Sequence, residues 1–212
     1  GRHASSQRPR APLSGSRRRR SKRILIIDNY DGCANNIYQL AGQLNPDVQV
    51  VRNDGVAVGD VERMAPSHLI LSGGSAAPER AGNSLELVRS FAGRVPILGI
   101  CLGYRIICAA YGGKSVQMAE IRQGKRELVH IAPSPLFHGL PDSFYAGFYH
   151  AETVPEENIP AEFSIIARSG KDVAGIAHRT QAIFGLQFHP ESFLSEYGKE
   201  IMSNFLRTAP AE

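Results

Sequence analysis

The hydrophobic positions of this chain fall into short runs of branched residues that alternate with segments of helical periodicity. Residues 24–28, Ile-Leu-Ile-Ile-Asp, form an apolar run typical of a strand buried on both faces. Similar runs predict strands at 48–51, 67–72 and 95–100, and amphipathic spacing predicts helices at 35–44, 84–91 and 102–111. This alternation favours an α/β fold with a doubly wound, mainly parallel sheet flanked by helices.

The second half of the chain is richer in strand-like segments. Strands are predicted at 126–131, 143–148, 163–168, 173–178 and 183–187, followed by a closing helix at 197–206. The folded domain is therefore expected to span residues 23–207, with a short tail at 208–212.

Basic residues gather at the N-terminus. The net charge of +4 reflects 24 Lys and Arg against 20 Asp and Glu, but residues 1–22 contain no acidic residue. This Arg/Ser/Pro-rich segment lacks apolar periodicity and is predicted to be a disordered arm or linker. It is compatible with a linker of a longer fused polypeptide, a transit-peptide remnant or an artificial boundary. The arginine run at 17–20 has no interleaved aromatic residues, so nucleic-acid binding is not expected.

Hydropathy and cysteine usage indicate the cellular compartment of the protein. No apolar run approaches the roughly 18 residues that a membrane helix needs, and no membrane association is expected. Cys33, Cys101 and Cys108 are an odd set without CxxC spacing, which supports neither a disulfide framework nor a zinc site. Free thiols favour a reducing compartment, so the protein is predicted to be cytoplasmic, or stromal if residues 1–22 derive from a transit peptide.

One cysteine lies at a predicted strand-to-helix junction. In the run 99–103, Gly-Ile-Cys-Leu-Gly, Cys101 follows a strand and precedes a helix. Such a turn exposes one side chain at a helix N-terminus, which stabilises a thiolate, and the amide of Leu102 faces a developing oxyanion. Cysteine is also a common core residue, so the turn alone leaves a nucleophile and a buried core residue both open.

A matching element ends the last predicted strand. The run 187–191, Gln-Phe-His-Pro-Glu, places His189 at a strand terminus, and Glu191 follows two residues later. In that arrangement the imidazole accepts the thiol proton and the carboxylate orients the ring. Two such elements at the ends of separate strands favour catalysis over a structural role for Cys101.

Together these motifs resemble the class I glutamine amidotransferases, whose glutaminase domain cleaves the side-chain amide of glutamine through a cysteinyl thioester. The segments 28–31, 71–74, 124–125, 149–150 and 189–192 are similar to the branch that serves anthranilate and aminodeoxychorismate synthases. The resemblance implies glutamine as substrate, a chorismate-utilising synthase as partner subunit or fused domain, and no metal or organic cofactor.

The resemblance also implies residue roles. Cys101 would be the nucleophile, His189 the general base and Glu191 its orienter, with the oxyanion hole formed by the backbone N–H groups of Leu102 and Gly74. The substrate-binding positions would be Arg105, Tyr149, His150 and Ala151.

Several positions depart from the family pattern. Tyr104 and Arg105 stand where the family usually has His and Gln, Gln123 replaces the usual His before Gly-Lys, and Ala151 replaces a Ser. An inward-pointing Arg105 would repel the α-ammonium group of glutamine, so Arg105→Gln is expected to raise the glutamine specificity constant. These departures keep open an alternative: a diverged protein with an altered substrate or a noncatalytic scaffold role.

Overall fold

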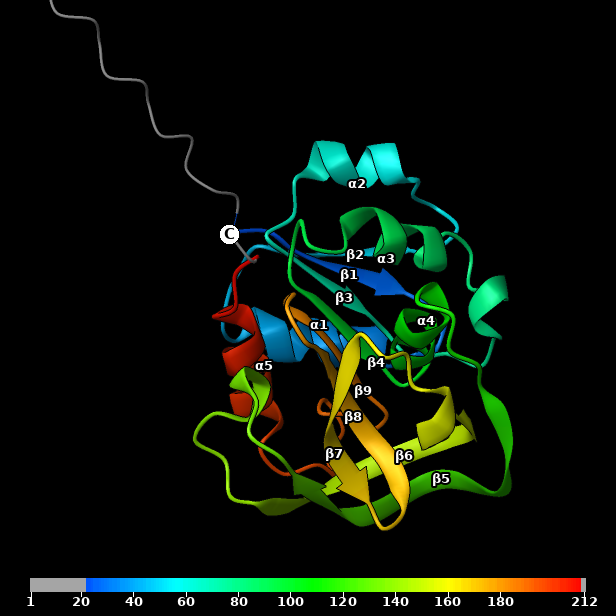
Figure 1. The fold of residues 1–212 in the computed structure, drawn as a ribbon. Coiled ribbons are helices and arrows are strands. Elements are labelled where there is room, and N and C mark those ends of the chain that lie inside the picture. The colour runs from blue at the N-terminus through cyan, green and yellow to red at the C-terminus, as the bar shows by residue number, and fades with distance from the viewer. Residues whose placement is uncertain (1–21, 211–212) are drawn as a thin grey trace, which may run out of the picture.

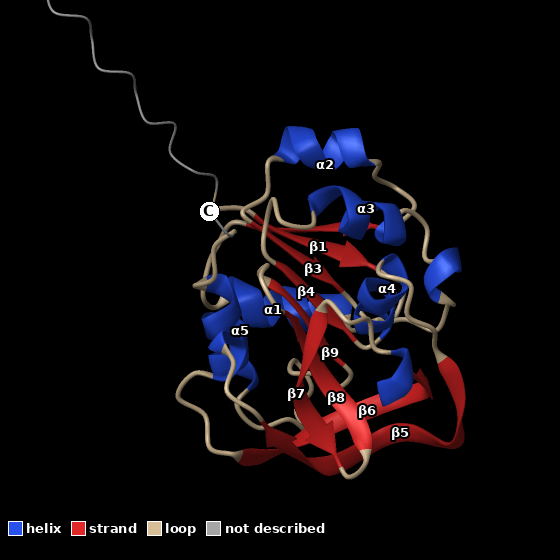
Figure 2. Cartoon of the chain, in the orientation of Figure 1, coloured by secondary structure: helices blue, strands red, loops and turns tan. Residues whose placement is uncertain are grey.

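The computed structural model describes residues 22–210, which form one mixed sheet covered by helices (Figures 1 and 2). Within these residues the sheet has nine strands in the order β2-β1-β3-β4-β9-β8-β7-β5-β6. The parallel half comprises β2 (Val48–Arg52), β1 (Ile24–Asp28), β3 (His68–Leu71), β4 (Ile97–Ile100) and β9 (Ile183–Leu186). The antiparallel extension comprises β8 (Asp172–His178), β7 (Phe163–Ser169), β5 (Val116–Ile131) and β6 (Ser143–Thr153).

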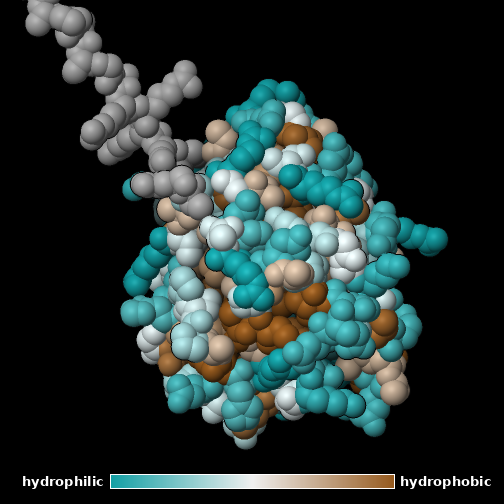
Figure 3. Space-filling model, in the orientation of Figure 1, coloured by the Kyte–Doolittle hydropathy of each residue, from teal (hydrophilic) through white to brown (hydrophobic). Residues whose placement is uncertain are grey.

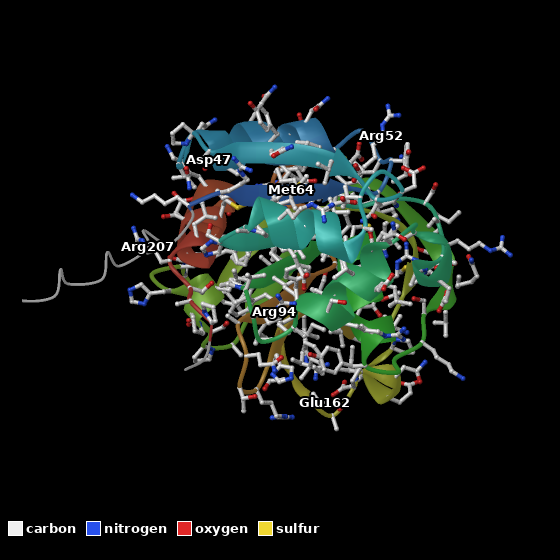
Figure 4. The ribbon with its side chains drawn as sticks, turned by 90° about the horizontal axis from the view of Figure 1, so that it is seen from above. Asp47, Arg52, Met64, Arg94, Glu162 and Arg207 are labelled. Carbon is white, nitrogen blue, oxygen red and sulfur yellow. The ribbon has the colours of Figure 1, made fainter. Side chains whose placement is uncertain are left out.

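Helices cover both faces of the parallel strands (Figure 1). One face is covered by α1 (Ala34–Gly42) and α5 (Gly198–Leu206), and the other by α2 (Val58–Met64), α3 (Ser84–Phe91) and α4 (Leu102–Ala110). Short 3-10 turns occur at Pro78–Arg80, Pro135–Phe137 and Glu156–Asn158. Figure 4 looks onto the α2 side, where Met64 of α2 and Arg94 lie.

Strand β1 shows how the sequence builds this core. Ile24 and Ile26 point into the cluster that contains α1 and α5, whereas Leu25 and Ile27 point into the cluster that contains α2, α3 and α4. All four side chains are fully buried, as expected when a parallel strand is covered on both faces. The predicted α/β fold with a mainly parallel sheet flanked by helices is therefore confirmed.

Two elements differ most from the sequence-based expectation. Helix α2 was not predicted, because this short segment buries only Val61 completely and so carries little amphipathic signal. Strand β5 begins at Val116 rather than 126, because its first half is mostly exposed and pairs with β6 through register shifts. The predicted arm at 1–22 falls almost wholly outside the described residues. Among the described helices, none is long and apolar enough to cross a membrane.

Candidate active site

The carboxyl ends of β1, β3, β4 and β9 bring the predicted site residues to one edge of the sheet. The loop after β1 contains Asp31, and the turn after β3 contains Gly73 and Gly74. Cys101 follows β4, and His189 follows β9. Clefts of open α/β sheets form at this edge, because the loops after neighbouring parallel strands meet there.

Cys101 occupies a strained strand-to-helix turn. Its φ of 54° and ψ of −104° are unusual for a non-glycine residue, which costs on the order of 1–3 kcal/mol. The Cys101 amide donates to the Leu186 carbonyl at 2.7 Å and fastens the turn to β9. A Cβ on Gly99 would lie 2.4 Å from the Gly103 carbonyl, and one on Gly103 would lie 2.4 Å from the Leu71 oxygen. The two glycines therefore let α4 begin directly against β3 and β4.

The Cys101 thiol is enclosed by two neighbours. Cys101 is 3% exposed, and its Sγ donates to the Tyr149 carbonyl oxygen at 3.6 Å. The Gln187 side-chain amide Nε2 donates to the same Sγ at 3.7 Å. Gln187 is a site residue that the sequence reasoning missed. Its signal was its place in the run 187–191, two positions before His189.

His189 is held by its backbone and by Glu191. Its amide donates to the Gly147 oxygen at 3.0 Å, and the Ser195 hydroxyl donates to its carbonyl at 2.6 Å. Nδ1 lies 2.5 Å from Glu191 Oε1, and both side chains are buried. Burial alone would lower the pKa of His189. The Glu191 carboxylate, with the nearby thiols of Cys101 and Cys33, outweighs burial and raises that pKa well above its usual value.

Gly74 and Leu102 flank the cysteine. A Cβ on Gly74 would lie 2.5 Å from the Asn29 oxygen and 2.7 Å from Leu102 Cδ2, so the two backbones approach closely. Leu102 is the first residue of α4, and its amide has no intrahelical acceptor. Within residues 22–210 neither amide donates to a backbone carbonyl. Asn29 anchors the turn, because its amide and its side-chain Nδ2 donate to the hydroxyl and carbonyl oxygens of Ser72.

Arg105 is neutralised by an acidic partner. Its guanidinium forms a hydrogen-bonded ion pair with Glu152, and the side chains are 5% and 27% exposed. Glu152 also accepts a hydrogen bond from Gln117 at 2.8 Å. The repulsion of the glutamine α-ammonium group that the sequence suggested requires an arginine without an acidic partner. Arg105 has such a partner in Glu152.

His150 lies beside this pair. Its Nδ1 is 2.8 Å from the Glu152 carbonyl oxygen. Burial lowers the pKa of His150 to about 4, and the charges of Arg122, Arg105 and His189 act in the same direction. The imidazole is therefore neutral at pH 7.

The remaining predicted positions lie along β5 and β6. The Tyr149 ring packs edge-on against His189 with centroids 5.2 Å apart, and its hydroxyl is 2.9 Å from Ser192 Oγ. Ala151 is half-buried on β6, and Gln123 is exposed on β5. Tyr149 therefore touches both catalytic candidates, Cys101 through its carbonyl oxygen and His189 through its ring. Within residues 22–210 no backbone hydrogen bond joins Ala151 to either of them.

A separate cavity lies away from these residues. It measures about 670 Å³ and is lined by residues near the amino end of β9 and by α5, among them Ala182, Phe184 and Asn204. The candidate site is at the opposite, carboxyl end of β9. Figure 3 shows apolar side chains gathered in a hollow on the face viewed in Figure 1.

Comparisons with known proteins agree with this architecture. A family model described as glutamine amidotransferase class-I matches residues 25–209. The chain is 40% identical to aminodeoxychorismate synthase component 2 of Escherichia coli K12, over 86% of this chain and 98% of that protein. It is 37% identical to aminodeoxychorismate/anthranilate synthase component 2 of Bacillus subtilis 168, over 87% of this chain and 96% of that protein.

A solved structure is also similar. A protein of Thermoplasma acidophilum described as a GMP synthase subunit superposes with a TM-score of 0.76 at 28% identity. The superposition covers 87% of this chain and 92% of that chain.

Proposed function

Since the chain belongs to the class-I glutamine amidotransferase family, we propose that it hydrolyses the side-chain amide of glutamine and passes the ammonia to a synthase partner. The observation that carries the proposal is the strained Cys101 turn beside the buried His189–Glu191 pair. A strained backbone at a buried thiol is costly, and such strain is typical of functional sites.

The reaction divides into two steps. Cys101, deprotonated by His189, attacks the side-chain carbonyl carbon of glutamine, and the backbone N–H groups of Leu102 and Gly74 stabilise the tetrahedral oxyanion. The carbon–nitrogen bond then breaks as the His189 imidazolium protonates the departing ammonia, which leaves a glutamyl thioester on Cys101. His189 next takes a proton from water, the hydroxide attacks the thioester, and glutamate leaves with the thiol restored.

Glu191 supports both roles of His189. The carboxylate holds Nδ1, which leaves Nε2 free to exchange a proton with the thiol, and it stabilises the imidazolium. The Glu191 carboxylate raises the pKa of His189, which favours the imidazolium that protonates the departing ammonia.

The residues around Arg105 form the proposed wall of the substrate site. Arg105, Tyr149, His150 and Ala151 are the substrate-binding positions that we propose from the family resemblance. The pairing of Arg105 with Glu152 favours glutamine as substrate, because the wall then carries no net repulsion toward the α-ammonium group. The same pairing weakens the case for an altered substrate, and the strained Cys101 turn weakens the case for a scaffold role.

The partner is proposed from the names of the relatives. Both curated relatives are called component 2 of synthases named for aminodeoxychorismate or anthranilate. We therefore propose a chorismate-utilising synthase as the ammonia acceptor, either as a separate subunit or as a fused domain.

The test is glutamate release from glutamine by the purified chain, alone and mixed with a chorismate-utilising synthase from the same source. Cys101→Ala is the matched control, because it removes only the thiol. We expect release by the unaltered chain, stimulation by the synthase, and no release by Cys101→Ala. Absence of release in the presence of a synthase that demonstrably binds, or equal release by Cys101→Ala, would refute the proposal.

A further inference from the structure

A second thiol lies beside the candidate base. One ligand atom each of Asp31, Cys33 and His189 lies within 4.8 Å of the other two. Cys33 is half-buried at the start of α1, and it lies close enough to His189 to affect its charge. The proposed hydrolysis uses neither Cys33 nor Asp31.

His189 presents an unused nitrogen to this group. Glu191 occupies Nδ1, so Nε2 is the ring atom that remains for a ligand. His189 is only 3% exposed, and its Nε2 is buried without a hydrogen-bond partner among the described residues. A buried nitrogen without a partner is free to bind a ligand. Metal-binding histidines typically donate their other ring nitrogen to a carboxylate in this way, and the carboxylate fixes the ring.

Asp31 is oriented in a comparable manner. Its Oδ1 accepts hydrogen bonds from the amides of Cys33 at 2.9 Å and Ala34 at 3.2 Å. Its Oδ2 is buried without a hydrogen-bond partner in the described part of the chain. A Cβ on Gly73 would lie 2.5 Å from this Oδ2 and 3.0 Å from His189 Cε1, so both groups face the same glycine. The absence of a side chain at Gly73 keeps that space open.

We propose that Asp31, Cys33 and His189 form a binding site for a thiophilic divalent cation, for which Zn²⁺ is the best match. Thiolate, imidazole and carboxylate are the ligands that zinc takes, and three protein ligands leave a fourth position for water. Zinc bonds of about 2.0–2.3 Å place ligand atoms about 3.5 Å apart, so a pair at the 4.8 Å limit must close by about 1 Å. Cys33 is only half-buried, so a cation can reach the group from its side.

Occupation of this site has a regulatory consequence, which rests on the proposed function. A nitrogen bonded to zinc has no lone pair for a proton, so His189 cannot deprotonate Cys101 or protonate ammonia. The metal therefore inhibits glutamine hydrolysis reversibly. Sequence spacing indicated no such site, because the pair at 31 and 33 is far along the chain from His189.

Cobalt spectroscopy separates this site from binding at the nucleophile. Co²⁺ is added to the purified chain and to the Cys33→Ala and Cys101→Ala variants, and the thiolate-to-cobalt charge-transfer band is recorded. We expect the band in the unaltered chain and in Cys101→Ala, its loss in Cys33→Ala, and its displacement by Zn²⁺. Asp31→Asn should weaken Zn²⁺ binding at least about tenfold. Circular dichroism and urea unfolding establish that each variant is folded.

Three outcomes would overturn the proposal: no band in the unaltered chain, a band that survives Cys33→Ala, or a band that is lost only in Cys101→Ala. In the activity assay Zn²⁺ should inhibit the unaltered chain, with recovery on adding a chelator. Relative to its own metal-free rate, Cys33→Ala should resist Zn²⁺, and equal fractional inhibition of this variant would instead indicate metal held by Cys101 and His189. Because the cobalt band needs no turnover, failure of the proposed hydrolysis would leave the binding test intact.

Discussion

Replacement of Arg105 by glutamine tests whether its charge is compensated within the fold. Arg105→Gln removes the cation but leaves Glu152, whose side chain is only 27% exposed. Gln117 then remains as the hydrogen-bond donor to that carboxylate, at 2.8 Å. The variant therefore leaves a partly buried anion without a charged partner.

The expected cost follows from this burial. Removing one member of a fully buried ion pair costs about 3–5 kcal/mol, because the other charge stays desolvated. Since Glu152 retains some contact with water, we expect Arg105→Gln to lower the free energy of unfolding by about 2–3 kcal/mol. The double variant Arg105→Gln/Glu152→Gln removes the stranded charge and should recover at least about 1 kcal/mol of that loss.

Urea unfolding of the single and double variants measures these free energies, with equal slopes required for the comparison. Arg94→Gln is the matched control. It breaks the Arg94–Glu62 pair, a 3.0 Å contact whose side chains are 53% and 47% exposed, on the side of the molecule seen in Figure 4. This surface pair should contribute less than about 1 kcal/mol.

Steady-state kinetics of Arg105→Gln test whether the charge of Arg105 acts on the substrate. Because Glu152 already neutralises Arg105, we expect no gain in kcat/KM for glutamine in Arg105→Gln, contrary to the expectation from sequence alone. A higher kcat/KM with unchanged stability would refute the reasoning, since it would mean that Arg105 acts as a free charge toward the substrate.

Two further predictions concern the fold around the site. The pKa of His150 is about 4 in the folded chain against 6.5 ordinarily, so the unfolded chain binds a proton first and stability falls as pH drops from about 6.5 to 4. Between pH 6.5 and 4 the free energy of unfolding, measured with urea, should fall by up to about 3 kcal/mol less in His150→Gln than in the unaltered chain. Identical pH profiles of the two proteins would contradict the assignment. Gly103→Ala should lower stability by about 1–3 kcal/mol and reduce glutaminase activity, because its Cβ would meet the Leu71 oxygen at 2.4 Å. Gly42→Ala, with open space at its Cβ, is the control and should be neutral or slightly stabilising; equal effects of the two changes would refute the packing argument.

Local patterns in the sequence determined the parallel half of the fold. The buried run at 24–28 and the helix at 84–91 were recognisable because periodicity records which side of an element faces the core. The same patterns placed Cys101 and His189 at the carboxyl ends of strands, and these ends lie along one edge of an α/β sheet. The first half of β5 was not predicted, because neither of its faces is consistently buried and its sequence therefore shows no regular pattern of apolar residues.

Tertiary structure alone decided which side chains meet across strands. Glu152 reaches Arg105 from 47 positions along the chain, and Gln187 reaches the Cys101 thiol from 86 positions away. The approach of Cys33 to His189 likewise depends on the order of β1, β3, β4 and β9 in the sheet. Periodicity reports how each element is buried but not which elements become neighbours, so charge compensation and the proposed metal site emerge only when the sheet is assembled.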